Sequence, residues 1–182
     1  MEFIKTDFEE LVLIKPNVYS DDRGYFYEFF NESNSSFKSN ELNFVQDNIS
    51  QSTQGTLRGL HFQKFHPQGK LVTCLQGSVL DVVVDIDIQS PTFGKHFSVE
   101  LSDSNHLMLW VPPSFAHGFY VLSKEAVFLY KCTDHYNKLD ESGIIWNDEY
   151  LNINWPTLTP TLSEKDSVLP SFKRATSFME NI

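Results

Sequence analysis

The sequence predicts an all-β fold, either an antiparallel sandwich or a barrel. Short runs of apolar and β-branched residues recur along the chain, and Gly, Pro, Asn, Asp or Ser residues separate them. The chain is rich in aromatic residues, with 16 Phe, 7 Tyr and 3 Trp, which pack well on pleated sheets. Signals for helices are confined to short segments. With 182 residues, the chain is expected to form one domain, residues 1–182, around one sizeable core.

The N-terminal strands are predicted from apolar and aromatic runs. The run LVLI, residues 11–14, is followed by a turn at Asp21-Asp22-Arg23-Gly24 and then by an aromatic run over residues 25–30. The segment FVQDNIS, residues 44–50, is a further short strand. These segments predict strands in the N-terminal part of the chain.

The strongest strand signal is KLVTCLQGSVLDVVVDIDI, residues 70–88, in which two β-branched runs are joined at Gln76-Gly77-Ser78. Strand-like segments continue at regular short spacing over residues 96–101, 106–113, 117–123 and 126–136. Serial strands separated by turn residues are typical of antiparallel sandwiches and barrels.

Two segments predict short helices of one or two turns. Residues 31–42 read NESNSSFKSNEL, with Asn31 or Ser33 as a possible N-cap. Residues 162–170 read LSEKDSVLP, with Ser163 as a possible N-cap and Pro170 as the stop.

Composition narrows the function classes. The formal net charge of −10 argues against nucleic acid or an anionic membrane as a partner. The chain has three arginines, Arg23, Arg58 and Arg174, and a locally basic pocket in an acidic protein favours a small anionic ligand such as a phosphate ester.

The first residues lack the pattern of a signal peptide, and no apolar run is long enough to span a bilayer. Cys74 and Cys132 are predicted to be buried, reduced thiols of a cytosolic protein, although their spacing does not exclude a disulfide.

The segment TLRGLHFQKFHPQGK, residues 56–70, places Arg58, His61 and Lys70 close together in sequence. A lone histidine in a strand usually has a structural role. Strict alternation would put Arg58 and His61 on opposite faces, but Gly59 between them could host a bulge that redirects a side chain.

A second histidine, His117, follows two prolines and a turn in WVPPSFAHGFYV. A Pro-turn-His-Gly entry into a strand is common in double-stranded β-helix (cupin) folds, and some cupins use this histidine as a metal ligand. Metal-binding cupins also bring an earlier His-x-His pair, whereas the earlier segment here reads Leu60-His61-Phe62-Gln63. Two histidines without a clear third ligand make a poor zinc or iron site, so no metal is predicted.

Tyr130 and Asp166 each allow a structural and a functional interpretation. Tyr130 is expected to point into the barrel, either bonded to a carbonyl or serving as a weak acid that protonates a carbanion. Asp166 is either a solvated acid or the group that accepts the Nδ1–H of a catalytic histidine. Asp81 and Asp85, in an apolar strand, are less favoured partners of that kind.

Nine segments of the chain match one known protein family, in the same order and with the same spacing, and together they extend over nearly the whole chain. They are DDRGYFYEFF, FVQDNIS, LRGLHFQ, QGKLVTCLQGSVLDVVVDI, SPTFGK, LSDSNHLMLWVPPSFAHGFYVLS, YKCTDHY, WNDEYLNINWP and LSEKD. The chain resembles the dTDP-4-dehydrorhamnose 3,5-epimerases. The resemblance implies a double-stranded β-helix (cupin/jelly-roll) barrel with additional N-terminal strands. It also implies a cytoplasmic homodimer without metal or organic cofactor, acting on a dTDP-4-keto-6-deoxyhexose in dTDP-L-rhamnose biosynthesis.

The resemblance also implies roles for individual residues. His61 matches the general base, Asp166 the acid that orients it, Tyr130 the acid that reprotonates carbon from the other face, and Lys70 the group near the C4 oxygen. Arg58, His117 and Lys165 match positions that bind the diphosphate and sugar. Further substrate-binding positions are matched by Gln46, Asp47, Asn48, Tyr136 and Glu141. Arg23 and Glu28 match positions that would reach the nucleotide from the neighbouring subunit. In this interpretation the diphosphate is the partner of basic side chains that would otherwise be buried alone.

Two positions depart from the family pattern. Ser114 stands where the family often has Gly, and Asp87 stands where Arg is common. Three alternatives remain open: a 3- or 5-epimerase of a related nucleotide 4-keto sugar, a metal-dependent cupin enzyme, and a noncatalytic sugar-binding cupin module.

Overall fold

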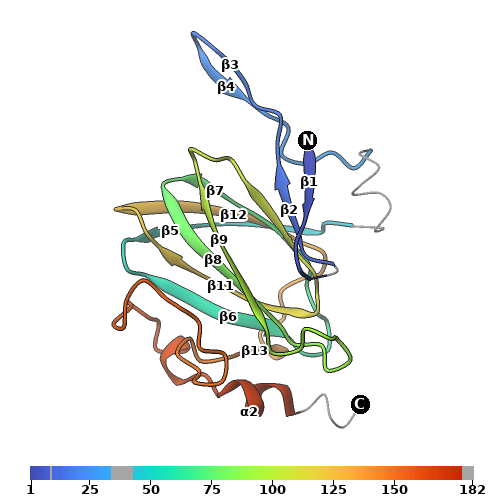
Figure 1. Cartoon of the computed structure of the whole chain (residues 1–182), viewed down its shortest axis with the longest axis vertical. Helices are drawn as coiled ribbons and strands as arrows, with labels where there is room; N and C mark the ends of the chain where they lie inside the picture. The colour runs from blue at the N-terminus through green and yellow to red at the C-terminus, as the bar shows by residue number, and fades with distance from the viewer. Residues whose placement is uncertain (9, 34–42, 178–182) are drawn as a thin grey trace.

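A computed structural model describes residues 1–8, 10–33 and 43–177 of the chain. It confirms the all-β prediction, with two antiparallel sheets facing each other (Figure 1). The six-stranded sheet has the order β1 (Glu2–Lys5), β2 (Val12–Lys15), β10 (Met108–Val111), β7 (Lys70–Gln76), β12 (Glu125–Cys132), β5 (Gln46–Thr53). The five-stranded sheet has the order β13 (Glu141–Gly143), β6 (Leu57–Gln63), β11 (Phe115–Val121), β8 (Ser78–Asp85), β9 (His96–Ser102).

The main core lies between the two sheets and fills one end of the space that they enclose. Val72 and Phe128 of the six-stranded sheet pack there with Val83 and Phe119 of the five-stranded sheet. The rings of Phe119 and Phe128 stack with centroids 4.4 Å apart. Because apolar side chains close this end, the polar residues on the same inner faces are left to line the other end.

The outer faces of both sheets are also covered. C-terminal residues, including Trp155 and Phe172, pack on the five-stranded sheet against Val82 and Val84. This second apolar layer explains why β8 is a nearly continuous β-branched run, because its side chains are buried on both faces. N-terminal residues form a smaller cluster on the six-stranded sheet around Trp110.

A two-stranded arm, formed by β3 (Tyr19–Asp21) and β4 (Gly24–Phe26), projects from the body of the molecule (Figure 1). The predicted turn at residues 21–24 joins its strands. The arm exposes Tyr19, Tyr25 and Phe26, while Phe29 and Phe30 of the same aromatic run pack beside the Trp110 cluster instead.

Most of the predicted strands are confirmed, although β1 and β13 were not predicted. The helix predicted over residues 31–42 falls largely outside the described residues. In the segment 162–170, a single 3₁₀ turn, η1 (Asp166–Val168), forms, and the Ser163 hydroxyl accepts a hydrogen bond of 3.0 Å from the Asp166 N–H. The helix α2 (Phe172–Thr176) was not predicted. Cys74 and Cys132 are both buried and free.

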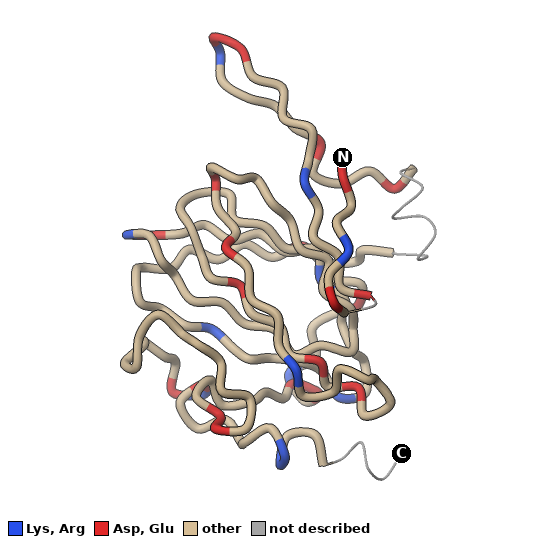
Figure 2. Tube along the Cα trace, in the orientation of Figure 1, with Lys and Arg blue, Asp and Glu red and all other residues tan. Residues whose placement is uncertain are grey.

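Basic residues are scattered along the trace among the acidic ones (Figure 2). Within the described ranges, none of the helices has the length and apolar character needed to cross a membrane.

Candidate active site

A cavity of about 580 Å³ opens between the two sheets at the polar end of their inner faces. The five-stranded sheet contributes Arg58, His61 and His117 to its lining, and the six-stranded sheet contributes Lys70 and Tyr130. The segment that carries Asp166 closes one side. A neighbouring cavity of about 290 Å³ shares His61, Lys70, Tyr130 and Glu141 and adds Gln46, Asn48, Gln63, Gln68 and Tyr136. The larger cavity alone has the size of a typical small-molecule site.

His61 and Asp166 form a close pair at this cavity. The Nε2 atom of His61 lies 2.6 Å from Oδ1 of Asp166, and the side chains are 26% and 4% exposed. Burial alone would raise the pKa of Asp166, but the hydrogen bond with His61 holds this pKa below its ordinary value. An ionised carboxylate only accepts hydrogen bonds, so Nε2 carries a proton, and in the neutral ring Nδ1 keeps the lone pair. The expectation that Asp166 would contact Nδ1 is therefore wrong.

A bulge at Gly59 explains how Arg58 and His61 reach the same cavity. The pairing of β6 with β11 shifts register between His117 and Phe119, opposite this part of β6. Gly59 has a φ of 114°, and a Cβ there would lie 2.7 Å from the Cα of Gly118. Only glycine fits both the conformation and the close approach. The predicted bulge is thus confirmed.

Arg58 itself differs from expectation, because its side chain is exposed rather than buried. Its Nε donates a hydrogen bond of 3.0 Å to the Ser52 hydroxyl, which orients the guanidinium at the cavity. Sequence reasoning did not find Ser52, because the bond joins two different strands.

Tyr130 and Lys70 lie on the wall opposite His61. Burial raises the pKa of Tyr130, and the nearby Arg58 charge only partly opposes this effect, so its phenol keeps its proton at neutral pH. Burial lowers the pKa of Lys70, whose side chain is almost fully enclosed. Among the described residues, neither the Tyr130 hydroxyl nor the Lys70 ammonium has a hydrogen-bond partner. The structural interpretation of Tyr130 required a carbonyl that accepts a hydrogen bond from its hydroxyl. No carbonyl of the described residues does so.

His117 has a carboxylate partner of its own. Its Nε2 lies 2.8 Å from Oδ2 of Asp81, and the side chains are 7% and 0% exposed. Asp81 was considered as a second partner for the catalytic histidine, and the structure corrects this by pairing it with His117. Asp85, the other candidate, instead accepts hydrogen bonds from the hydroxyls of Ser90 and Thr92.

The residues expected to contact the nucleotide divide into two groups. Gln46 and Asn48 face the smaller cavity, whereas Asp47 points to the other side of β5 and pairs with Lys131 at 2.7 Å. Tyr136 lines the same cavity and donates a hydrogen bond of 3.0 Å to Glu141.

Lys165 binds the other carboxylate oxygen of Glu141 at 2.7 Å. Burial alone would raise the pKa of Glu141, but the hydrogen bonds from Lys165 and Tyr136 lower it. These three residues form a connected group at the junction of the two cavities.

Arg23 and Glu28 do not reach either cavity within one chain. Arg23 lies at the tip of the arm and pairs with Asp21 at 2.6 Å, and Glu28 accepts a hydrogen bond from Asn31. The two departures from the family pattern also lie elsewhere. Asp87 and Ser114 line a separate depression of about 230 Å³ that shares no residue with the larger cavity.

Some lining residues carried no usable signal in the sequence. Thr161 and Leu162 line the larger cavity from a loop, and Gln63 lines the smaller one. No group of three or more His, Cys, Asp or Glu side chains within residues 1–8, 10–33 and 43–177 is arranged to hold a metal ion.

Residues 5–174 match the family model described as dTDP-4-dehydrorhamnose 3,5-epimerase. A protein of that name from Shigella flexneri is 49% identical over 168 residues, covering 91% of this chain and 93% of the relative.

Two solved structures show the same fold. The Legionella pneumophila dTDP-6-deoxy-D-glucose-3,5-epimerase in complex with dTDP-4-keto-L-rhamnose is 45% identical, with a TM-score of 0.90 over 94% of this chain and 93% of that one. A 3′-monoepimerase from Streptomyces bikiniensis in complex with dTDP-quinovose is 29% identical, with a TM-score of 0.87 over 96% and 89%. These neighbours confirm the double-stranded β-helix, cupin-like fold. The chain belongs to the dTDP-4-dehydrorhamnose 3,5-epimerase family.

Proposed function

We propose that this member of the family inverts C3 and C5 of dTDP-4-keto-6-deoxyglucose through an enolate, as a cytoplasmic step of dTDP-L-rhamnose biosynthesis. One observation supports this more than any other: His61 and Tyr130 line one cavity from opposite sheets. A base and an acid placed on opposite sides of a sugar ring are what an inversion at carbon requires. The reaction needs neither a metal nor an organic cofactor.

His61 is the base. The C4 ketone acidifies the hydrogens on C3 and C5, and a neutral imidazole can remove one of them. With Nε2–H donated to Asp166 at 2.6 Å, Nδ1 is the nitrogen that accepts the proton. The carboxylate then stabilises the imidazolium that forms.

Lys70 supports the enolate. When a proton leaves C3 or C5, negative charge develops on the C4 oxygen. The Lys70 ammonium, buried in the cavity wall, stabilises this charge where water would otherwise have to do so. Loss of a donor of this kind costs about a hundredfold in rate.

Tyr130 returns a proton to the opposite face. The raised pKa of its phenol keeps the proton available. Protonation from the side away from His61 inverts the carbon, and a second cycle at the other carbon completes the reaction.

The remaining polar residues bind the substrate. Arg58, His117 and Lys165 surround the larger cavity and hold the diphosphate and sugar. Gln46, Asn48, Tyr136 and Glu141 line the smaller cavity and hold the nucleotide, whereas Asp47 pairs with Lys131 on the other side of β5.

The functional unit is a homodimer. The arm that carries Arg23 exposes three large aromatic side chains to solvent. In a dimer, this arm would bring Arg23 and Glu28 to the nucleotide of the neighbouring subunit.

A single-centre epimerase is the second candidate, because the monoepimerase relative shares the fold over most of the chain. NMR of dTDP-4-keto-6-deoxyglucose with the enzyme in D₂O separates the two. Deuterium at both C3 and C5, together with the L-configured product, is the expected result. Exchange at only one carbon would assign the narrower reaction, and no exchange at either would overturn the proposal.

A further inference from the structure

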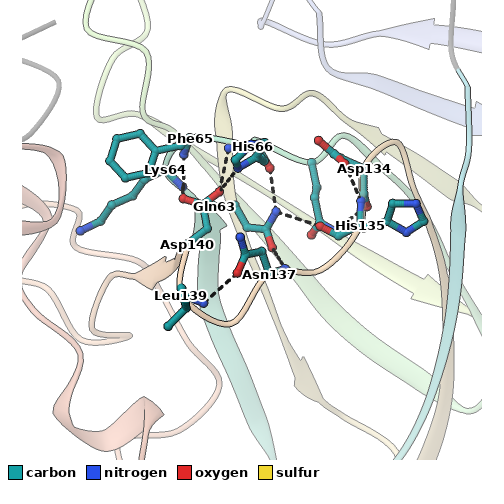
Figure 3. Close-up of polar contacts among 10 residues, drawn as sticks. Gln63, Lys64, Phe65, His66, Asp134, His135, Asn137, Leu139 and Asp140 are labelled. Carbon is teal, nitrogen blue, oxygen red and sulfur yellow. Dashed lines mark hydrogen bonds and ion pairs between the residues drawn. The ribbon is translucent and has the colours of Figure 1, made fainter.

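Two loops beside the nucleotide end of the site are joined by a buried network of hydrogen bonds (Figure 3). Gln63, the last residue of β6, is at its centre, and only 5% of the residue is exposed. Its amide nitrogen donates to the carbonyls of His66 and His135, at 2.7 and 3.3 Å, and its amide oxygen accepts from the N–H of Asn137 at 2.7 Å. One side chain thus uses both ends of its amide to connect the loop after β6 with the loop after β12.

These contacts bracket Tyr136. Gln63 holds the peptide groups of the residues on either side of Tyr136, and the N–H of Tyr136 itself donates to Gln46 at 2.9 Å. Tyr136 is 51% exposed, so its ring is not fixed by burial in a core. Its position depends on how the backbone around it is held.

A second contact anchors the far end of the same loop. Asp140 is buried and accepts hydrogen bonds from the N–H groups of Lys64, Phe65 and His66, at 3.1, 2.8 and 2.7 Å (Figure 3). Burial alone would raise the pKa of Asp140, but the hydrogen bonds from Phe65 and His66 lower it. Asp140 directly precedes Glu141, whose carboxylate accepts a hydrogen bond from the Tyr136 hydroxyl.

Gln63 also lies on the strand that carries the base. His61 and Gln63 are two residues apart on β6 and line the same smaller cavity. The strand therefore fixes both the imidazole and the backbone that carries Tyr136.

We infer that Gln63 is a positioning residue that sets the placement of Tyr136 relative to His61, and hence the affinity for the thymidine end of the substrate. The inference rests on the proposed function, in which Tyr136 holds the nucleotide, and it takes that contact to be stacking of the Tyr136 ring on the base. It assigns Gln63 to binding and leaves proton transfer to His61, Asp166 and Tyr130.

The test compares Gln63→Met with the unchanged enzyme, using dTDP as the probe for binding and the 4-keto sugar for kinetics. Gln63→Met is expected to weaken dTDP binding and raise KM about tenfold, the scale of one base–aromatic stacking contact, with kcat changed less than twofold. Gln63→Glu, which keeps the acceptor but loses both donor bonds, is expected to act in the same direction. It also serves as the second variant if Gln63→Met does not fold.

The specific readout is coupling to Tyr136. Tyr136→Ala should weaken dTDP binding as much as Gln63→Met or more, and the double variant should lose no more than Tyr136→Ala alone. A control, Gln54→Met, removes a glutamine-to-carbonyl bond to Leu122 away from both cavities and should leave dTDP binding unchanged.

Additive losses in the double variant, or a fall in kcat at unchanged KM, would overturn the inference. The dTDP titrations report on Gln63 even if the unchanged enzyme does not convert the 4-keto sugar. Failure of the proposed function is thereby distinguished from failure of this inference.

Discussion

Two histidine–aspartate pairs lie side by side in the cavity, and His61 and His117 are direct partners across β6 and β11. In both pairs Nε2 contacts the carboxylate, at 2.6 Å for His61 and 2.8 Å for His117. The surroundings of the two rings differ. The side chain of His61 is 26% exposed and its aspartate comes from a 3₁₀ turn, whereas that of His117 is 7% exposed and its aspartate comes from the adjacent strand β8.

Under the proposed function, contact with a carboxylate does not by itself make a histidine a base. His117 is almost fully buried and stacks on the ring of Phe128, with centroids 6.2 Å apart and an angle of 21° between the ring planes. His61 has a more open ring, with Nδ1 as the nitrogen left free by Asp166. We therefore expect His61 to move protons and His117 to hold the substrate, and the following variants separate these roles.

The largest effect is expected from Asp166→Asn. The amide can donate to Nε2 and so shift the ring proton to Nδ1, where it blocks proton abstraction. We expect kcat to fall about a thousandfold, within the range that a misplaced general base costs. Steady-state kinetics with the 4-keto sugar measure this effect. Glu164→Gln changes an exposed acid on the same segment and is the matched control. An equal fall in kcat in this control would contradict the role assigned to Asp166.

Lys70→Met extends the comparison to the opposite wall and should separate activity from stability. Activity is expected to fall about a hundredfold because the enolate loses its charge partner. Stability is expected to rise by about 1 kcal/mol or more at pH 7, because a buried ammonium that has no hydrogen-bond partner among the described residues is replaced by an apolar chain of similar length.

The pH dependence of this stability gain has a defined sign. Burial lowers the pKa of Lys70 in the folded state below its ordinary value, so between the two pKa values the unfolded chain binds one more proton than the folded chain. The cost is fully present below the folded pKa and disappears as pH rises toward the unfolded value. Urea unfolding at pH 7 and near pH 10 should therefore show a smaller difference between variant and parent at the higher pH. A difference that grows with pH would contradict this account.

A smaller and different effect is expected from His117→Asn. Loss of one charge-assisted contact to the substrate should raise KM roughly tenfold to a hundredfold. Deuterium exchange into bound substrate should continue at a rate close to that of the parent. If exchange stops at saturating substrate, then His117 takes part in proton transfer and the distinction between the two pairs fails.

Most of the fold follows from local patterns in the sequence. The turn at residues 21–24, the junction at Gly77 and the short strands around them all have local signals, and Gly59 marked the bulge. Alternation along β5 also separates Asp47 from Gln46 and Asn48, although the resemblance grouped the three together.

The polar partnerships required the tertiary structure. The pairing of Asp81 with His117 depends on the register of β8 against β11. Gln63 and Asn137 are 74 residues apart in sequence, and no periodicity brings their loops together. Helix α2 is stabilised by packing on the five-stranded sheet rather than by a local side-chain cap, so local sequence signals do not predict it.

The central claim is that His61 and Tyr130 act on opposite faces of one sugar ring, and Tyr130→Phe in D₂O tests it most directly. The variant keeps the base but lacks the acid on the far wall. We predict that NMR will show deuterium entering the sugar next to the ketone while epimerised product forms at least a hundredfold more slowly than in the parent. Inversion at the parental rate in this variant would contradict the account.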